Sequence, residues 1–285
     1  TSFLNNSPLR ELLRHVVPFQ RLQELISEGV LHALCVTCSD YSSGGSSSFY
    51  QGHPTIQDWK RHRRIGIRDN INLKHLMASS AIPMIFPAVA IDHQFYGDGS
   101  VGFLSPISPA LHLGADKVLV IGLDPTPDKP RYICYDKNRH PSATEIAGHI
   151  LDSVFIDSLD SDLERIRRIN QTLDSVPEHL LSQVKLDLKK VETLVITPSQ
   201  DLGSLLAETV HELPFSSAFF LKRLGVDVEK GSNLLSYLLF EQGYCRSLIN
   251  LGYQDGLKKE SEIRHFFRHL NNQAHYTAPP NYDVY

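Results

Sequence analysis

Strand-like apolar runs alternate with helical segments over the first 123 residues, and this order constrains the fold more than any other feature of the chain. Residues 32–38 form an apolar run with few charges, as expected of a strand covered on both faces. A helix expected over 108–114 precedes 117–123, a run rich in β-branched residues. Strand, helix and strand in this order predict a βαβ unit, hence an α/β protein with a largely parallel sheet.

The remaining elements follow from caps, periodicity and turn residues. Ser7 and Pro8 resemble the cap and first position of a short helix, and a second helix is expected over 20–28. Residues 40–48 read as a polar turn, and residues 49–51 as a returning strand. Further along we expect a helix over 73–79 and a hairpin of 86–91 with 94–96. A Pro-rich connection over 126–141 is expected to lead to a long helix, which the capping box at 142–145 opens. A strand over 193–198 and helices from 204 to a polar tail complete the predicted elements.

The composition is that of an ordinary water-soluble globular protein, with 41% hydrophobic and 21% charged residues. Lys and Arg number 28 against 32 acidic residues, so the formal charge of −4 gives no general electrostatic basis for binding nucleic acid. No apolar run reaches the roughly 18 residues of a spanning helix, and the N-terminal residues do not resemble a signal peptide. We expect a cytoplasmic protein, with peripheral membrane contact as a further option.

Cys35 and Cys38 form a C-x-x-C pair, which in some proteins binds zinc or carries redox chemistry. The pair lies inside the expected strand 32–38, where cysteine acts as a small apolar residue, and no second C-x-x-C completes a metal site. We therefore expect reduced thiols, no metal and no cofactor.

Residues 60–64, Lys-Arg-His-Arg-Arg, are the densest basic run of the chain. Such runs are most often solvated helix faces, and this is the first expectation. Contact with anionic lipid headgroups is the alternative. A second candidate for membrane contact is the aromatic and basic stretch 215–224, for which core packing is the more frequent explanation.

Asp98 is the candidate catalytic residue, because it follows an expected strand and stands between Gly97 and Gly99. Glycines on both sides are expected to allow backbone conformations that a Cβ would forbid, so that the carboxylate is presented at the sheet edge as a base. The alternative is a structural turn, since Asp-Gly is a common turn dipeptide.

A nucleophile for this base is not evident in the chain. No serine stands in a G-x-S-x-G elbow, and no phosphate loop, dinucleotide-binding glycine motif or H-E-x-x-H pair occurs. Ser46 comes nearest to an elbow but is expected in a polar hairpin-like loop, where a nucleophile is improbable.

Five segments in order resemble landmarks of the patatin-like phospholipase family. The last of them, Leu113 to Val118, follows the Gly97-Asp98-Gly99-Ser100 element that stands in the place of the family's catalytic D-G-G or D-G-A. Ser100 stands where the family more often has Gly or Ala, so one small residue replaces another. The other landmarks are 7–13, 36–40 with Gly44, and 78–83 with Phe86 and Pro87.

The resemblance implies a three-layer patatin-like α/β sheet flanked by helices, with a mainly helical C-terminal extension. It implies the C-terminal part of a catalytic domain over 1–125, a connection over 126–141, an extension over 142–274 and a tail over 275–285. The family's glycine-rich oxyanion loop and its nucleophilic serine precede the landmarks found here, so we expect both to lie outside this chain, either because the chain is a fragment or because another chain supplies them.

The expected function is accordingly that of a lipid acyl hydrolase, of phospholipase A or esterase type. Asp98 would be the base of a Ser–Asp dyad, Gly97, Gly99 and Ser100 would support it, and Ile82, Phe86 and Phe95 could desolvate its carboxylate. The substrate would be a phospholipid or another acyl-ester lipid, without cofactor, metal or nucleic acid. Two alternatives stay open: an inactive relative that binds lipid or protein, and an unrelated α/β protein that binds a nucleotide at its strand ends.

Overall fold

The computed structural model describes residues 2, 4–101, 105–123, 143–177, 188–202, 205 and 242–268, with the backbone alone over 143–158. Two compact units share the chain: Thr1–Val118 with Glu145–Glu192, and Leu119–Thr144 with Thr193–Tyr285. The predicted connection 126–141, the basic stretch 215–224, Cys134 and the tail lie outside the described residues.

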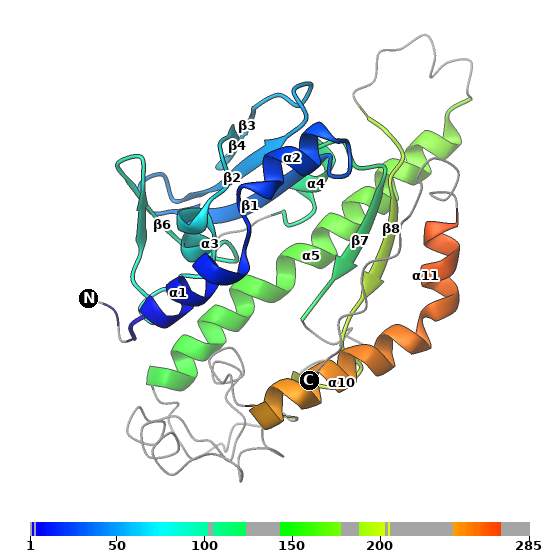
Figure 1. Cartoon of the computed structure of the whole chain (residues 1–285). Coiled ribbons are helices and arrows are strands. Elements are labelled where there is room, and N and C mark those ends of the chain that lie inside the picture. The colour runs from blue at the N-terminus through cyan, green and yellow to red at the C-terminus, as the bar shows by residue number, and fades with distance from the viewer. Residues whose placement is uncertain are drawn as a thin grey trace. The chain divides into compact units, whose positions relative to one another are not determined.

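The first unit is built on a mixed six-stranded sheet of order β3-β4-β2-β1-β6-β5 (Figure 1). β2 and β4 are parallel, and the other four neighbouring pairs are antiparallel. The strands are β1 (Ala33–Asp40), β2 (Gly45–Gly52), β3 (Trp59–Arg61), β4 (Arg64–Arg68), β5 (Val89–Ile91) and β6 (Gln94–Gly97).

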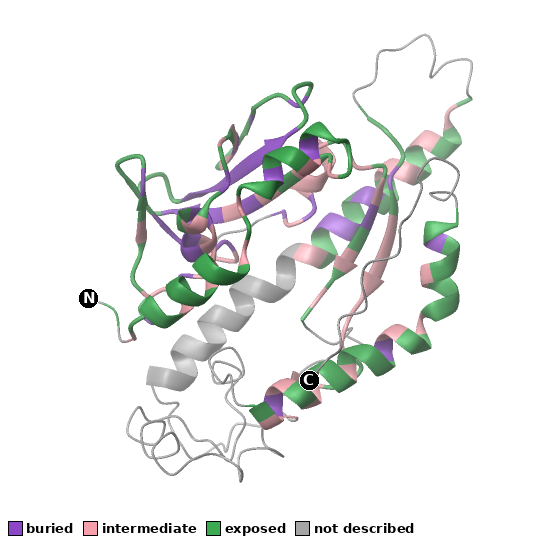
Figure 2. Ribbon diagram, in the orientation of Figure 1, coloured by how far each residue is buried: buried purple, intermediate pink, exposed green. Residues whose placement is uncertain are grey.

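Helices contact both faces of this sheet. They are α1 (Ser7–Val16), α2 (Arg21–Ser27), α3 (Leu73–Ser79) and α4 (Ser108–His112). On one face the core joins Leu22 and Ile26 of α2 and Ala78 of α3 to Val36 and Phe49 of the central strands. On the other face Tyr50, Ile56 and Trp59 form a second cluster, against which Leu113 at the end of α4 packs. β2 contributes to both clusters and is buried along its length (Figure 2).

Helix α1 begins one residue earlier than a Ser7 cap would require, since Asn6 is its N-cap residue. Asn5 Oδ1 instead accepts from the Ser7 N–H (3.0 Å) and from Ser7 Oγ (2.7 Å). The expected apolar side of this helix is only partly covered: none of its residues is buried, and Leu12 is 58% exposed.

The predicted parallel sheet is wrong for the first unit, and β7 (Lys117–Ile121) is not part of its sheet. β7 pairs with β8 (Glu192–Ile196) in a separate two-stranded sheet. The Glu192 N–H donates to Asp116 O (3.0 Å) and the Gly122 N–H donates to Ile196 O (2.9 Å), so the two strands run parallel. The long helix α5 (Ala143–Ser175) lies between them in the chain, which makes β7-α5-β8 the crossover unit.

Two further expectations are corrected. The turn predicted over 40–48 is confined to residues 41–44, because β2 begins at Gly45. The basic run 60–64 belongs to the hairpin of β3 and β4 rather than to a helix.

The second unit contains α10 (Gln242–Lys258) and α11 (Glu260–Phe267). The buried carboxylate of Asp255 accepts from the Ser199 N–H (2.8 Å) and from Lys258 Nζ (2.8 Å). Among the helices that the structure describes, none is long and apolar enough to cross a bilayer.

Candidate functional site

Asp98 follows β6 directly, and its backbone is held from two sides. Its N–H donates to Ala81 O (2.9 Å), and the Gly99 N–H donates to Ser79 O (3.3 Å). Ser39 Oγ of β1 donates to Asp98 O (2.8 Å) and also to Val101 O. The sequence segments 78–83 and 97–100, which are well separated along the chain, are therefore hydrogen-bonded to each other.

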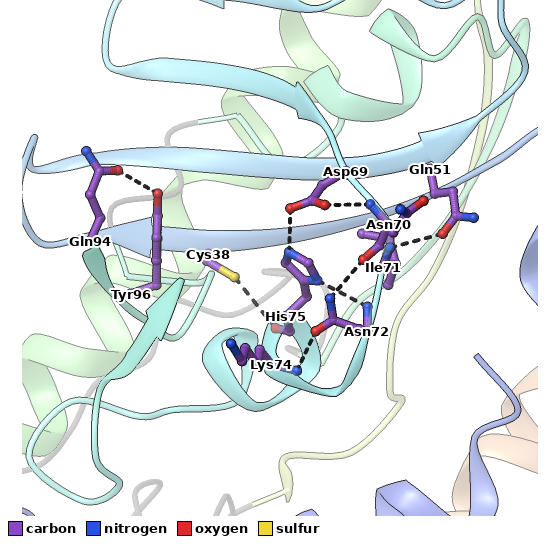
Figure 3. A network of polar contacts seen from close by, with 10 residues as sticks. All are labelled: Cys38, Gln51, Asp69, Asn70, Ile71, Asn72, Lys74, His75, Gln94 and Tyr96. Atoms are coloured by element: carbon purple, nitrogen blue, oxygen red, sulfur yellow. Dashed lines mark hydrogen bonds and ion pairs between the residues drawn. The ribbon is translucent and has the colours of Figure 1, made fainter. Parts of the chain in front are cut away.

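The segment that supports Asp98 is positioned by helix α3, which begins with a capping box. Asn72 Oδ1 accepts from the Lys74 N–H (3.0 Å), and His75 Nδ1 accepts from the Asn72 N–H (3.1 Å), as Figure 3 shows. His75 is only 1% exposed and its ring packs on Phe49 with 4.7 Å between centroids. Its other nitrogen, Nε2, faces Asp69 Oδ2 at 3.3 Å.

Burial lowers the pKa of His75 below its ordinary value of 6.5, although the Asp69 carboxylate opposes this shift. The neutral ring with the proton on Nε2 fits this arrangement, because Nδ1 then accepts from the Asn72 N–H, while Nε2 approaches Asp69 Oδ2 without hydrogen-bond geometry. His75 is thus a structural residue of the α3 N-terminus, and the sequence analysis did not single it out. Its position three residues after Asn72 was the available signal.

The flanking glycines are needed for space and not for unusual backbone conformation. Neither Gly97 nor Gly99 has a positive φ, so the conformational reason expected from the sequence is wrong. A Cβ at Gly97 would overlap the phenol of Tyr41, and a Cβ at Gly99 would overlap the backbone carbonyl of Thr37. Gly99 lets the turn around Asp98 lie against the backbone of strand β1, whereas Gly97 makes room for the side chain of Tyr41.

The carboxylate of Asp98 is partly exposed, and its two oxygens differ. Oδ1 accepts from the Ser100 N–H (2.9 Å) and from Ser100 Oγ. Oδ2 accepts no hydrogen bond from the described residues. Ser100 therefore orients the carboxylate, which gives a physical form to the supporting position expected for it from the sequence.

The surroundings of Asp98 are more open than expected. Phe95 is 56% exposed, while Ile82 and Phe86 are half-buried. Tyr41 is close enough for the carboxylate to raise the pKa of its phenol, after burial, which is the larger cause. Asp98 likewise adds to burial in raising the pKa of the Cys38 thiol to about 12.

The structure gives no support for metal or redox chemistry at the C-x-x-C pair. Cys35 and Cys38 are three residues apart on one strand, so their side chains point to opposite faces of the sheet. Burial raises the pKa of Cys35 to about 11, which leaves it a protonated, unreactive thiol at neutral pH. Among the described residues no group of three or more potential ligands could hold a metal ion.

Serines near Asp98 do not make a nucleophilic site. Ser39 Oγ and Ser79 Oγ donate to backbone carbonyls, the latter to Thr37 O at 2.7 Å. Ser100 Oγ does contact the Asp98 carboxylate, but within the same tight turn. Ser46 is 3% exposed inside β2, not in a loop as predicted.

The chain matches no known protein-family model and no curated protein sequence. The site consists of a fixed turn with a partly exposed carboxylate, and one oxygen of that carboxylate accepts no hydrogen bond from the residues that the structure describes.

Proposed function

We propose that this chain carries the catalytic base of a lipid acyl hydrolase, with Asp98 as the acid of a Ser–Asp dyad. The observation that carries the proposal is the turn around Asp98, in which hydrogen bonds from Ser39 and to Ala81 hold the backbone, while Oδ2 accepts no hydrogen bond from any residue within the described ranges. The resemblance of segments 78–83 and 97–100 to the patatin-like family supports the same role. In this proposal the nucleophilic serine lies outside residues 1–285.

The proposed chemistry uses Asp98 Oδ2, the carboxylate oxygen that accepts no hydrogen bond from the described residues. The serine hydroxyl would give its proton to Asp98 Oδ2 as its oxygen attacks the ester carbonyl of the lipid. The alcohol would then leave with a proton from Asp98, and water would hydrolyse the acyl-enzyme by the same route. Ser100 keeps the carboxylate oriented, and backbone N–H groups outside this chain would stabilise the oxyanion, each contributing about 3–4 kcal/mol.

The substrate class is a phospholipid or another acyl-ester lipid, met at a membrane surface by a protein that needs no metal or cofactor for this reaction. Direct proton transfer between serine and aspartate requires neither. Nucleic acid is not a proposed partner, because the charge balance of −4 gives no general attraction to it.

The experiment compares Asp98→Asn with Asp92→Asn in the full-length encoded protein. Asp98→Asn should lower kcat/KM for a phospholipid or an acyl ester by about 10²–10⁴-fold while leaving the circular dichroism spectrum unchanged. Asp92, at φ 44 in the β5–β6 turn, is the matched control, because asparagine tolerates that conformation and activity should persist. Near-normal turnover of Asp98→Asn would remove this residue from the mechanism.

A second measurement tests where the nucleophile lies. A fluorophosphonate probe, which reacts with activated serines, should leave residues 1–285 unlabelled and label the full-length protein. Stoichiometric labelling of Ser100 or any other serine in this chain would contradict the proposal.

One observation favours a non-enzymatic alternative, a module that binds lipid or protein. Both hydrogen bonds from Ser100 to Asp98 Oδ1 lie within a single turn, as they do when aspartate has a purely structural role. This alternative predicts an encoded protein without any G-x-S-x-G element and without esterase activity.

A further inference from the structure

A row of polar side chains crosses one face of the six-stranded sheet. Arg61 of β3 is paired with Arg64 of β4, and Arg64 is paired with Ser46 of β2. Residues paired in register on neighbouring strands point to the same side of a sheet. The side chains of Arg61, Arg64 and Ser46 therefore share a face, the one that carries Trp59 and Tyr50.

Two atoms of this row are buried and accept or donate no hydrogen bond within the part of the chain that the structure describes. Ser46 is 3% exposed, and one of the two atoms is its Oγ. The other is Nη1 of Arg64, the residue paired with Ser46. A buried donor without a partner costs free energy, so each of these atoms calls for a ligand or an ordered water.

The paired arginines concentrate positive charge at this place. Arg61 and Arg64 are directly opposite on adjacent strands, a pairing of like charges that is unfavourable, and Arg61 Nη1 donates to Lys60 O (3.1 Å). None of the ion pairs formed by the described residues includes Arg61 or Arg64.

The pKa of His112 is also affected by the positive charge of Arg61 and Arg64. Its ring stacks on Trp59 with 4.8 Å between centroids, on the face of the row. Burial lowers the pKa of His112, and the next causes are the positive charges of Arg61 and Arg64; no carboxylate contributes to the shift. Both guanidinium groups thus lie near a ring that is neutral at physiological pH.

Other polar side chains near Arg61 and Arg64 either have hydrogen-bond partners or point to the opposite face of the sheet. Arg63 donates through Nε to Gly44 O (3.2 Å). Ser47 Oγ is also unpartnered, but Ser47 is adjacent to Ser46 in β2 and points to the opposite face. Lys60 is paired with Ile65 and likewise points away from the row.

We propose that Arg61, Arg64 and Ser46 form a binding site for a phosphate-type oxyanion. The planar guanidinium of Arg64 and the hydroxyl of Ser46 would donate to its oxygens from within, and the exposed Arg61 would close the site from outside. Such a site takes one phosphate group, either of a soluble phosphate or of a lipid headgroup. It is separate from Asp98, because strands β2 and β1 lie between β4 and β6, and it does not depend on the proposed hydrolase activity.

The first test is thermal unfolding in increasing inorganic phosphate, with sodium chloride at matched ionic strength as reference. Phosphate should raise the Tm saturably, because it binds the folded state. Arg64→Met should weaken phosphate binding about tenfold or more, and Ser46→Ala several-fold. Without phosphate, Arg64→Met should be as stable as the parent or more stable, since it removes a like-charge pair; this result also verifies that the variant folds.

Lys60→Gln is the matched control, since it removes one positive charge from the same hairpin on the opposite face. It should keep the full phosphate effect. If Lys60→Gln and Arg64→Met lose the phosphate-induced rise in Tm equally, the rise comes from non-specific electrostatics. If phosphate does not saturably stabilise the parent, water satisfies Ser46 Oγ and Arg64 Nη1. Either result overturns the proposal.

A second test distinguishes the two sources of the phosphate. Vesicles of phosphatidylcholine with and without phosphatidic acid are sedimented with the protein. A lipid headgroup is the ligand if vesicle binding meets three conditions. It requires phosphatidic acid, inorganic phosphate displaces it, and Arg64→Met abolishes it. Saturable phosphate binding without vesicle binding identifies a soluble phosphate.

Discussion

The turn around Asp98 depends on two missing Cβ atoms. Because the carbonyl of Thr37 belongs to the central strand β1, it cannot move aside to make room for a side chain at position 99. The glycines were singled out from the sequence for the correct position but for the wrong physical reason, since close approach leaves no local signal in the sequence.

Substituting Gly99 by alanine should therefore destabilise the protein, by about 1–3 kcal/mol. Gly256→Ala in α10 is the control of opposite sign: nothing lies within 4 Å of its Cβ, and alanine in a helix interior should add roughly 0.5–1 kcal/mol. Urea unfolding measures both. Unchanged stability of Gly99→Ala would mean that β1 and the Asp98 turn are not in contact.

At the scale of elements, one buried carboxylate joins helix α5 to the segment before α4. Asp162 is 7% exposed and accepts from Ser105 Oγ (2.6 Å and 2.7 Å) and from the Ile107 N–H (3.1 Å). The sequence of this helix carries an apolar stripe from Ile146 to Ile166 at helical spacing, and Leu163 and Ile166 in its last part are buried as such a stripe predicts. The part of that stripe within residues 146–155 lies outside the described side chains.

Asp162→Asn should cost about 1–3 kcal/mol, because an amide replaces one acceptor oxygen by a donor that faces the Ser105 hydroxyl and the Ile107 N–H. Asp160→Asn, on the exposed side of the same helix, should change the unfolding free energy by less than about 0.5 kcal/mol. Denaturant titration of the two variants makes the comparison. Equal effects would indicate that the charge of α5 matters rather than the hydrogen bonds of Asp162.

The crossover unit is the element that the sequence placed least well. A strand was correctly predicted near 117–123, but its partner is β8, more than 70 residues later in the chain, and not the sheet of the first unit. Asn170 of α5 contributes to this arrangement, because its side chain donates to Val191 O (2.8 Å) and accepts from the Val191 N–H (3.0 Å) just before β8. Neither contact has a counterpart in the hydrophobic pattern.

For the molecule as a whole, two histidines with lowered pKa, one buried and one half-buried, contribute to the pH dependence of stability. His75 and His112 both have a lowered pKa in the folded state. Below their ordinary value of 6.5 the unfolded chain binds more protons than the folded one, so the free energy of unfolding falls as the pH drops from about 6.5 toward the folded pKa. Above about pH 7 this contribution is constant.

His75→Gln should reduce that slope, since the variant leaves only the half-buried His112 of the pair. Protonation of His75 would also place a donor against the Asn72 N–H and disrupt the capping box of α3. Urea unfolding between about pH 5 and 7.5 measures the effect, with the exposed His62→Gln as control. An identical slope in both variants would assign the pH dependence to other groups.

The sequence by itself determined the local elements and the landmark around Asp98. Helix α3 spans the predicted residues 73–79, and the hairpin of β5 and β6 lies close to the predicted residues 86–91 and 94–96, because the signals for such elements act over a few residues. Tertiary structure decided the strand directions, the partner of β7, the close approaches at Gly97 and Gly99, and the meeting of Arg61, Arg64 and Ser46 on one face. These features depend on contacts between residues far apart in the chain, and the free energy of such contacts is set by packing and burial, which the order of residues alone does not display.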